Sequence, residues 1–270
     1  MTALEPPSQS SPRPAVYKLL AVGLAAGILS GLLGVGGGVI IVPLLALWLA
    51  FPQKMAQATS LVAIFFASIS GAVSYGLGGD ILIVPALLIA VAGISGTFIG
   101  AWLLHRMAEH QVQMLFVIIL VIAAVRMAWG SQSPDAGGAE VFGIWHYVGF
   151  ALAGLAMGAL SSLVGVGGGI VLVPTLVFLM GISSHVAQGT SLLVMIPIAF
   201  TGAWRNSRHG YVNWRAGIWI GAAGIAGAAG GSLFALELPE VWLQRGFAVL
   251  LLYSAYRLLR QARNRPRPEK

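Results

Sequence analysis

The sequence contains no cysteine and very few charged residues. None of its 270 residues is Cys, which excludes disulfides and thiolate metal sites. Asp, Glu, Lys and Arg make up 9% of the chain, whereas soluble domains have roughly 25%. Hydrophobic residues make up 58%, and the mean hydropathy is +0.88. This composition excludes an ordinary soluble domain and predicts an all-α polytopic membrane protein, with the lipid bilayer as its first partner.

A glycine-rich element occurs twice inside apolar runs. GVGGGVIIVP spans residues 34–43, and GVGGGIVLVP spans 165–174, which is an offset of 131 residues. The same offset aligns Gln57-Ala58-Thr59-Ser60 with Gln188-Gly189-Thr190-Ser191, and it pairs Ser30 with Ser161 and Glu109 with Glu240. Polar residues that keep one register over this length indicate an internal duplication.

Both halves contain the same series of apolar segments. The expected segments are 16–33, 38–51, 58–76, 81–104 and 110–129 in the first half and 145–164, 169–181, 189–204, 216–235 and 241–257 in the second. An odd number per half makes the second half enter the membrane from the opposite side. The second segment of each half is short, so the first two can form a hairpin. The predicted fold is two inverted repeats, each with about four crossings plus a Gly-broken hairpin, or about 8 to 10 membrane segments.

The distribution of basic residues predicts the topology. With the N-terminus inside, all of the 15 Lys and Arg residues except Arg126 and Arg245 fall on the cytoplasmic side. The expected organisation is a disordered cytoplasmic tail (1–15), a first membrane repeat (16–129), an external connector (130–144), a second repeat (145–257) and a basic cytoplasmic tail (258–270). Both termini are then expected in the cytoplasm.

The glycine elements are candidates for an anion site. Backbone that leaves the helix within a bilayer must be buried in protein or line a wet cavity. Each GVGGG break precedes a helix whose free N–H groups and positive dipole end favour an anion. Close helix packing is the alternative, and it is the preferred interpretation for spaced glycines such as Gly93, Gly96, Gly217, Gly221, Gly224 and Gly227.

Neutral polar residues extend this candidate site. The predicted substrate-binding residues are Gly36, Gly37, Gly38, Gln57, Thr59, Ser60, Gly167, Gly168, Gly169, Gln188, Thr190 and Ser191. For the Thr and Ser residues, capping of their own helices is an equally weighted alternative. No metal site and no cofactor are expected, because the five His residues lack metal-ligand spacing.

These motifs resemble those of the TauE/SafE family, also called the toluene sulfonate uptake permease family. The residues that carry the resemblance are Gly34, Gly36 to Gly38 and Pro43, with Gly165, Gly167 to Gly169 and Pro174, each set followed by a Gln-x-Thr-Ser element. The resemblance covers about residues 20–259. It implies a secondary carrier of small sulfur-containing anions, such as sulfite, sulfoacetate and organosulfonates, often in the export direction. It does not identify the anion.

Other functions are less well supported by the sequence. A passive anion channel is the main alternative, because no Asp or Glu lies in the middle of an expected span to carry a coupling proton. The same feature favours efflux driven by the membrane potential, with Glu109 and Glu240 as the symmetric carboxylates that could add proton coupling. Gly93-Ile94-Ser95-Gly96 resembles a rhomboid protease motif, but no His lies deep in a span to act as base, so an enzyme is not expected. The expected partners are a small anion and a second copy of the chain, not nucleic acid.

Overall fold

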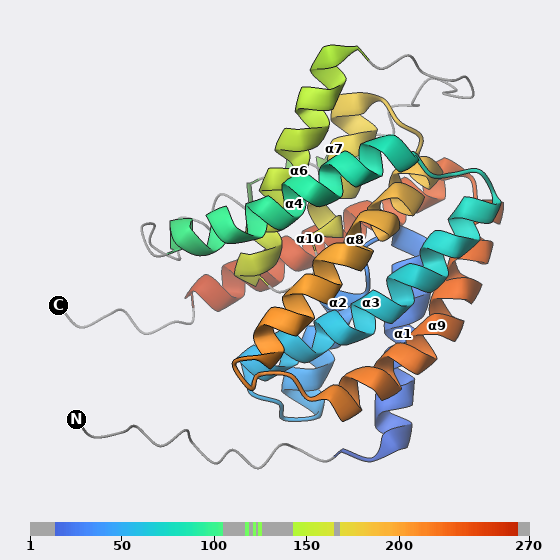
Figure 1. The fold of residues 1–270 in the computed structure, drawn as a ribbon. Coiled ribbons are helices and arrows are strands. Elements are labelled where there is room, and N and C mark those ends of the chain that lie inside the picture. Colours follow the sequence, from blue (N-terminus) through green and yellow to red (C-terminus); the bar gives the residue numbers. More distant parts are fainter. Residues whose placement is uncertain are drawn as a thin grey trace.

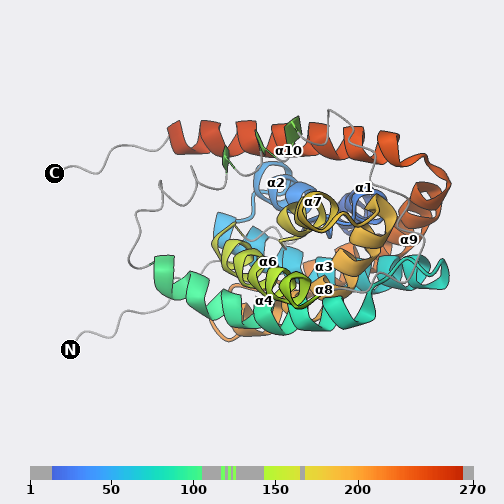
Figure 2. The same ribbon diagram turned by 90° about the horizontal axis from the view of Figure 1, so that it is seen from above.

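The computed structural model describes residues 14–104, 117–118, 121–122, 124–125, 143–164 and 168–263, and within them all regular structure is helical. The elements are α1 (Val16–Leu33), α2 (Gly38–Pro43), a π-helix η1 (Leu44–Trp48), α3 (Gln53–Leu77), α4 (Ile83–Leu104), α6 (Ile144–Val164), α7 (Gly169–Met180), α8 (Ser184–Ser207), α9 (Trp214–Glu237) and α10 (Glu240–Arg263). The helices form one bundle, with α10 along one side and α4 along the opposite side (Figures 1 and 2).

Most expected segments match observed helices. The segment 16–33 is α1 to the residue, and the glycine breaks separate α1 from α2 and α6 from α7. The third segments were expected to start at 58 and 189, but α3 starts at Gln53 and α8 at Ser184, so those starts were wrong. Of 110–129, only 117–118, 121–122 and 124–125 are described, and they are helical. The tail 1–13 and most of the connector 130–144 lie outside the described residues.

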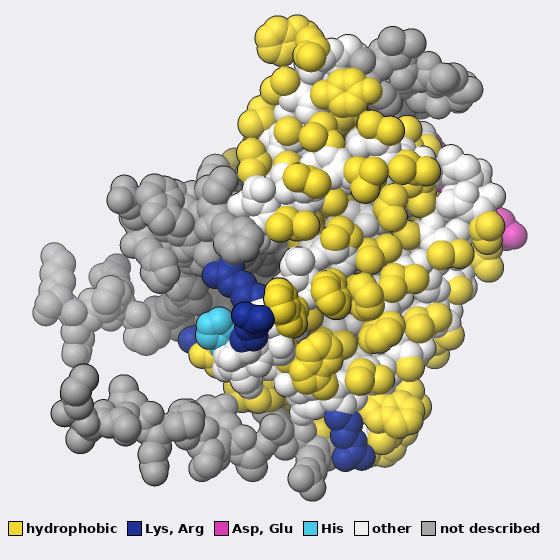
Figure 3. Space-filling view, in the orientation of Figure 1, with side chains coloured by type: hydrophobic (Ala, Val, Ile, Leu, Met, Phe, Trp, Pro, Cys, Tyr) yellow, Lys and Arg dark blue, Asp and Glu magenta, His cyan; other side chains and the backbone are white. Residues whose placement is uncertain are grey.

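Among the residues that the structure describes, four helices are long and apolar enough to cross a membrane. They are Val16–Leu33, Gln53–Leu77, Ser184–Ser207 and Trp214–Glu237, and shorter apolar helices cover Gly38–Trp48, Ile83–Thr97 and Ile144–Gly158. Large apolar side chains such as Leu47, Leu77 and Leu87 are exposed on the surface. Hydrophobic side chains cover most of the face in Figure 3, and the visible Lys and Arg lie in its lower half, one group at the left side and another at the bottom. An exposed apolar surface of this extent suits a bilayer.

Small residues allow the long helices to pack closely. A methyl group at Gly27 of α1 would lie 2.5 Å from Gly224 O of α9, and one at Gly227 would lie 2.5 Å from Leu24 O. Gly217 and Gly221 face Val62 and Phe66 of α3 in the same way. The packing interpretation of these spaced glycines is therefore confirmed, because a side chain at these positions would separate the helices.

The close contacts also give the helix directions. Gly23, Gly27 and Gly31 of α1 meet residues 220, 224 and 228 of α9 in the same order, so these two helices are parallel. By contrast, Tyr75 of α3 meets Gly189 of α8, and Leu61 meets Gly202. The helices α3 and α8 therefore run antiparallel beside each other (Figure 1).

Candidate anion site

The two glycine elements meet inside the bundle. After α1, the backbone at Gly34, Gly36 and Gly37 has positive φ, and Gly168 before α7 does as well. A Cβ at Gly169 would lie 2.8 Å from Gly34 O and 3.0 Å from Val35 Cα. The turn formed by residues 34–37 therefore touches the start of α7, while 165–167, including Gly167, lie outside the described residues.

Glycine is required in these turns for space as well as for conformation. A Cβ at Gly34 would lie 2.6 Å from Gln188 Cα, and one at Gly37 would lie 2.7 Å from Ala26 O. A Cβ at Gly168 would lie 2.6 Å from Met157 Cγ. Since φ at all three glycines is also positive, any other residue would be strained and crowded.

The turn before α7 presents a helix N-terminus to the first glycine turn. Gly168 O accepts from Val171 N and Leu172 N, as expected where a helix begins. The first N–H groups of an α-helix have no partner within it, and the dipole makes this end positive. Gly38 begins the shorter α2 in the same way, with Gly37 O accepting from Ile40 N and Ile41 N.

Gln188 and Ser191 of α8 connect that helix to the first glycine turn. Ser191 Oγ donates to Gly34 O at 2.9 Å. Tyr75 Oη lies 2.7 Å from Gln188 Oε1 and 2.9 Å from Gly31 O, and its single hydroxyl proton serves these two acceptors. Gln188 is fully buried, and within the described part of the chain its Nε2 has no hydrogen-bond partner.

Two further buried polar atoms share this property. Ser30 Oγ and Ser68 Oγ have no partner among the described residues. Ser30 lies one helical turn after Ala26, which contacts Gly37, and Ser68 lies one turn after Ile64, which contacts Gly36. Gln188 thus touches the first glycine turn directly, whereas Ser30 and Ser68 lie one helical turn from residues that touch it, and all three side chains can donate a hydrogen bond to an anion.

The two threonines have a different place. Thr59 Oγ1 accepts from Asn213 N at 3.0 Å, and Thr190 Oγ1 accepts from Leu82 N at 3.1 Å. Asn213 and Leu82 directly precede α9 and α4, so each threonine anchors the start of a neighbouring helix. The expectation that they cap their own helices was wrong, because α3 and α8 start earlier, at caps Pro52 and Ser183.

Gln57 and Ser60 lie on α3 in the positions that Gln188 and Ser191 occupy on α8. Ser60 Oγ donates to Gln57 O at 2.7 Å, and Gln57 is half-buried. Under the repeat offset, residues 165–167 correspond to residues 34–36 of the first glycine turn, and they lie outside the described residues. Six of the predicted residues therefore lie where the first glycine turn meets the start of α7 and α8. They are Gly36, Gly37, Gly168, Gly169, Gln188 and Ser191.

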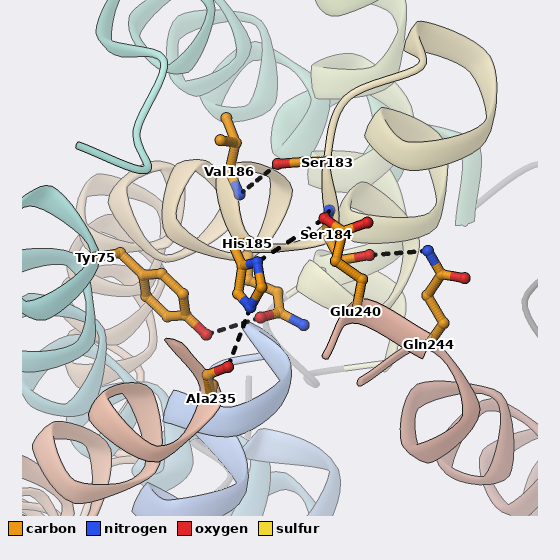
Figure 4. Close-up of polar contacts among 9 residues, drawn as sticks. Tyr75, Ser183, Ser184, His185, Val186, Ala235, Glu240 and Gln244 are labelled. Atoms are coloured by element: carbon orange, nitrogen blue, oxygen red, sulfur yellow. Dashed lines mark hydrogen bonds and ion pairs between the residues drawn. The ribbon is translucent and has the colours of Figure 1, made fainter. Parts of the chain in front are cut away.

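A separate polar cluster lies where α8 begins. His185 Nε2 is 3.1 Å from Ala235 O, and His185 Nδ1 is 3.8 Å from Glu240 Oε1 (Figure 4). Burial raises the pKa of the nearby Asp80 carboxyl above its ordinary value, and the charge of His185 offsets part of this rise. No group of three or more His, Asp or Glu suitable for a metal ion occurs in the described ranges.

Sequence reasoning missed part of this arrangement. Tyr75 carried no signal, because its role arises only where α3 passes α8. Ser30 is the single serine of its apolar run, and the isolation of its hydroxyl was the available signal, whereas Ser68 shares its segment with other serines and gave none. Ser95 of the protease-like motif donates to Val91 O on its own helix, at 3.1 Å.

Comparison with known proteins agrees with a transport role. The family model described as "Sulfite exporter TauE/SafE" matches residues 19–181 and 150–270. The "Probable membrane transporter protein YdhB" of Bacillus subtilis is 27% identical over 236 residues, which cover 84% of this chain and 93% of the relative. A "Probable membrane transporter protein" of Haemophilus influenzae is 28% identical over 261 residues, covering 87% and 95%. No solved structure gives a significant match.

Proposed function

The chain belongs to the TauE/SafE family of membrane transporters, and on this premise we propose that it is a secondary carrier exporting small sulfur-containing anions across the bacterial inner membrane. Sulfite, sulfoacetate and organosulfonates are the proposed substrates. The first of these follows the name of the family model, and all are oxyanions that accept several hydrogen bonds at once.

The observation that carries the proposal is the group of unpartnered donors at the glycine turn. Ser30 Oγ, Ser68 Oγ and Gln188 Nε2 are buried without a protein partner in the described residues, and the start of α7 touches the same glycine turn that Gln188 touches. Buried polar groups are nearly always hydrogen-bonded, so three exceptions around one turn indicate a ligand site. Neutral donors and a helix N-terminus bind an anion without the strong retention of a salt bridge, which suits a site that must also release it.

We also propose that the two halves are inverted repeats, which would allow the site to face either side in turn. Helix pairings support this arrangement. The offset of 131 relates α1 to α6 and α9 to α4, and the close pairs are α1 with α9 and α4 with α6. Gly37 faces Ala26 just as Gly168 faces Met157. The two glycines are 131 residues apart, and so are Ala26 and Met157.

Counterflow in proteoliposomes tests the function. Vesicles loaded with unlabelled sulfite or sulfoacetate should take up the labelled anion, with a rate that saturates. A passive channel would instead conduct current and show no exchange, and that result would replace the carrier with the channel.

A Gln188→Glu variant tests the site. It keeps the size of the side chain, removes the Nε2 donor and adds a negative charge. Exchange should fall by more than about tenfold, because a hydrogen bond to a charged group contributes about 1.5–3 kcal/mol. Gln53→Glu, at an exposed position at the start of α3, is the matched control and should exchange normally. Normal exchange by a folded Gln188→Glu variant would refute the site.

A further inference from the structure

The cluster at the start of α8 joins three helices at one end of the bundle. His185 comes from α8, Ala235 from the end of α9 and Glu240 from the start of α10 (Figure 4). His185 and Glu240 keep 19% and 31% of their side-chain surface exposed, so water can bring protons to them. The cluster lies outside the group of donors at the glycine turn.

The geometry fixes the proton positions on the His185 ring. Ala235 O can only accept, and its other hydrogen bond comes from Leu238 N at 3.0 Å. His185 Nε2, 3.1 Å away, must therefore carry the hydrogen. In the neutral ring Nδ1 is then bare, and its lone pair faces the Glu240 carboxylate at 3.8 Å.

Glu240 is held in place as a hydrogen-bond acceptor. The N–H of Ser184 donates to its Oε1 at 2.9 Å, and Gln244 Nε2 donates to Ser184 Oγ at 3.2 Å. The carboxylate also lies at the N-terminal end of α8, where the helix dipole is positive. An added proton can therefore bind to His185 Nδ1, where the imidazolium forms an ion pair with Glu240.

The other ionisable groups around the ring are mostly acidic. Asp80, in the connection between α3 and α4, interacts electrostatically with His185 and also with Tyr75 of α3. Glu237 ends α9, and Arg245, one turn along α10 from Glu240, is exposed over the Trp242 ring.

The cluster is connected to the proposed anion site through α8. His185 and Gln188 are three residues apart on this helix and so lie on neighbouring positions of one face. We propose that a proton binds between His185 Nδ1 and Glu240 and is carried together with the anion as its coupling ion. This inference rests on the proposed transport function. An anion at Gln188 and a positive charge at His185 stabilise each other, and by linkage each strengthens the binding of the other.

Proton coupling at this place differs from the expectation of potential-driven efflux. That expectation followed from the lack of a carboxylate in the middle of a span. Here the carboxylate and the histidine lie at the ends of their helices and act on the site along α8. One proton moving with one anion lowers the charge carried per cycle, so the anion's own gradient and the pH gradient become the driving forces.

Ring protonation can be measured without any substrate. In protein labelled with 15N-histidine and placed in lipid nanodiscs, the His185 signals are those that disappear in His185→Gln. At about pH 8 or above, where histidine is ordinarily neutral, hydrogen should be on Nε2 alone, and acid should add it to Nδ1. A neutral ring protonated at Nδ1 would overturn the inference.

Transport at zero potential tests the coupling. With valinomycin and equal K⁺ on both sides, a medium one pH unit more acidic than the lumen should drive labelled sulfoacetate inward to about tenfold accumulation at one proton per anion. His185→Gln and Glu240→Gln should lose this accumulation, while counterflow remains but needs a higher anion concentration for half-maximal rate, because the linked proton is absent. Gln at 240 can still accept from Ser184 N–H. His209→Gln, in the α8–α9 connection, is the control and should keep both activities.

The outcomes separate the two proposals. If the wild type fails to exchange sulfite or sulfoacetate, the proposed function fails, and the ring measurement alone decides the proton site. If the wild type exchanges sulfoacetate but does not accumulate it, or if both variants accumulate it normally, coupling by His185 and Glu240 is refuted.

Discussion

Ser30 Oγ, Ser68 Oγ and Gln188 Nε2 are buried polar atoms that have no hydrogen-bond partner within the described protein. Leaving a buried donor unsatisfied costs about 1–3 kcal/mol, so a fold under selection for stability alone would favour apolar side chains there. Groups that are costly in the free protein and satisfied by a ligand are what a binding site requires. The three side chains should therefore affect stability and affinity in opposite directions.

We predict that Ser30→Ala and Ser68→Ala each raise the free energy of unfolding, by up to about 1 kcal/mol, because each removes an unsatisfied hydroxyl. Both should weaken anion binding. Thermal unfolding in detergent and the substrate concentration at half-maximal exchange measure the two effects.

Ser191→Ala is the matched control for these serines. Its hydroxyl donates to Gly34 O, so its loss should lower stability by about 1 kcal/mol. If Ser30→Ala and Ser68→Ala were destabilising in the same way, their hydroxyls would have partners in the protein, and the ligand interpretation would fail.

At the scale of the helices, the threonine anchors set where α4 and α9 begin. Thr190→Val keeps the shape of the side chain but leaves Leu82 N–H without its acceptor. We predict a loss of stability of about 1–2 kcal/mol with little change in anion affinity. Thr190→Ser keeps the hydroxyl and should restore most of the stability. A large fall in affinity at unchanged stability would show instead that Thr190 binds substrate.

Two adjacent glycines of α9 give a sharp test of the packing between α1 and α9. A methyl group at Gly231 would meet the Ile28 carbonyl of α1, whereas one at Gly230 meets nothing within 4 Å. We predict that Gly231→Ala destabilises by about 1–3 kcal/mol through overpacking. Gly230→Ala should stabilise slightly, by about 0.5–1 kcal/mol, because alanine favours the helix. Equal effects in thermal unfolding would contradict the close helix contact.

How far the sequence predicts these elements depends on how local their causes are. The helix α1 was predicted to the residue, because Pro14 and the glycines at 34–38 delimit a continuous apolar run. The start of α3 was missed, because Gln53 and Lys54 read as a polar connection although the helix continues through them. The glycine turns were predicted from backbone chemistry alone. The role of Tyr75 beside Gln188 was not, since it depends on two helices 113 residues apart in sequence.

At the scale of the whole molecule, one arrangement relates the helix directions, the duplicated sequence and the basic residues. The helices α3 and α8 occupy the same position in the two halves and run antiparallel. Their C-terminal ends therefore lie at opposite ends of the bundle. Arg205 and Arg208 lie at the end of α8, whereas the end of α3 is followed by Asp80. From the positive-inside rule we predict that the end of α8 lies in the cytoplasm and the end of α3 outside.

The lack of cysteine makes this topology directly testable. Gly79 follows α3 and Gly210 follows α8; both are exposed, both have positive φ, and neither would bring a side chain within 4 Å of other atoms. The backbone strain of the two substitutions is therefore matched. In intact cells, a membrane-impermeant maleimide should label Gly79→Cys, whereas Gly210→Cys should react only after the membrane is opened. Labelling of both from the same side would show that the two halves enter the membrane in the same direction, and the inverted arrangement with its site accessible from either side would be lost.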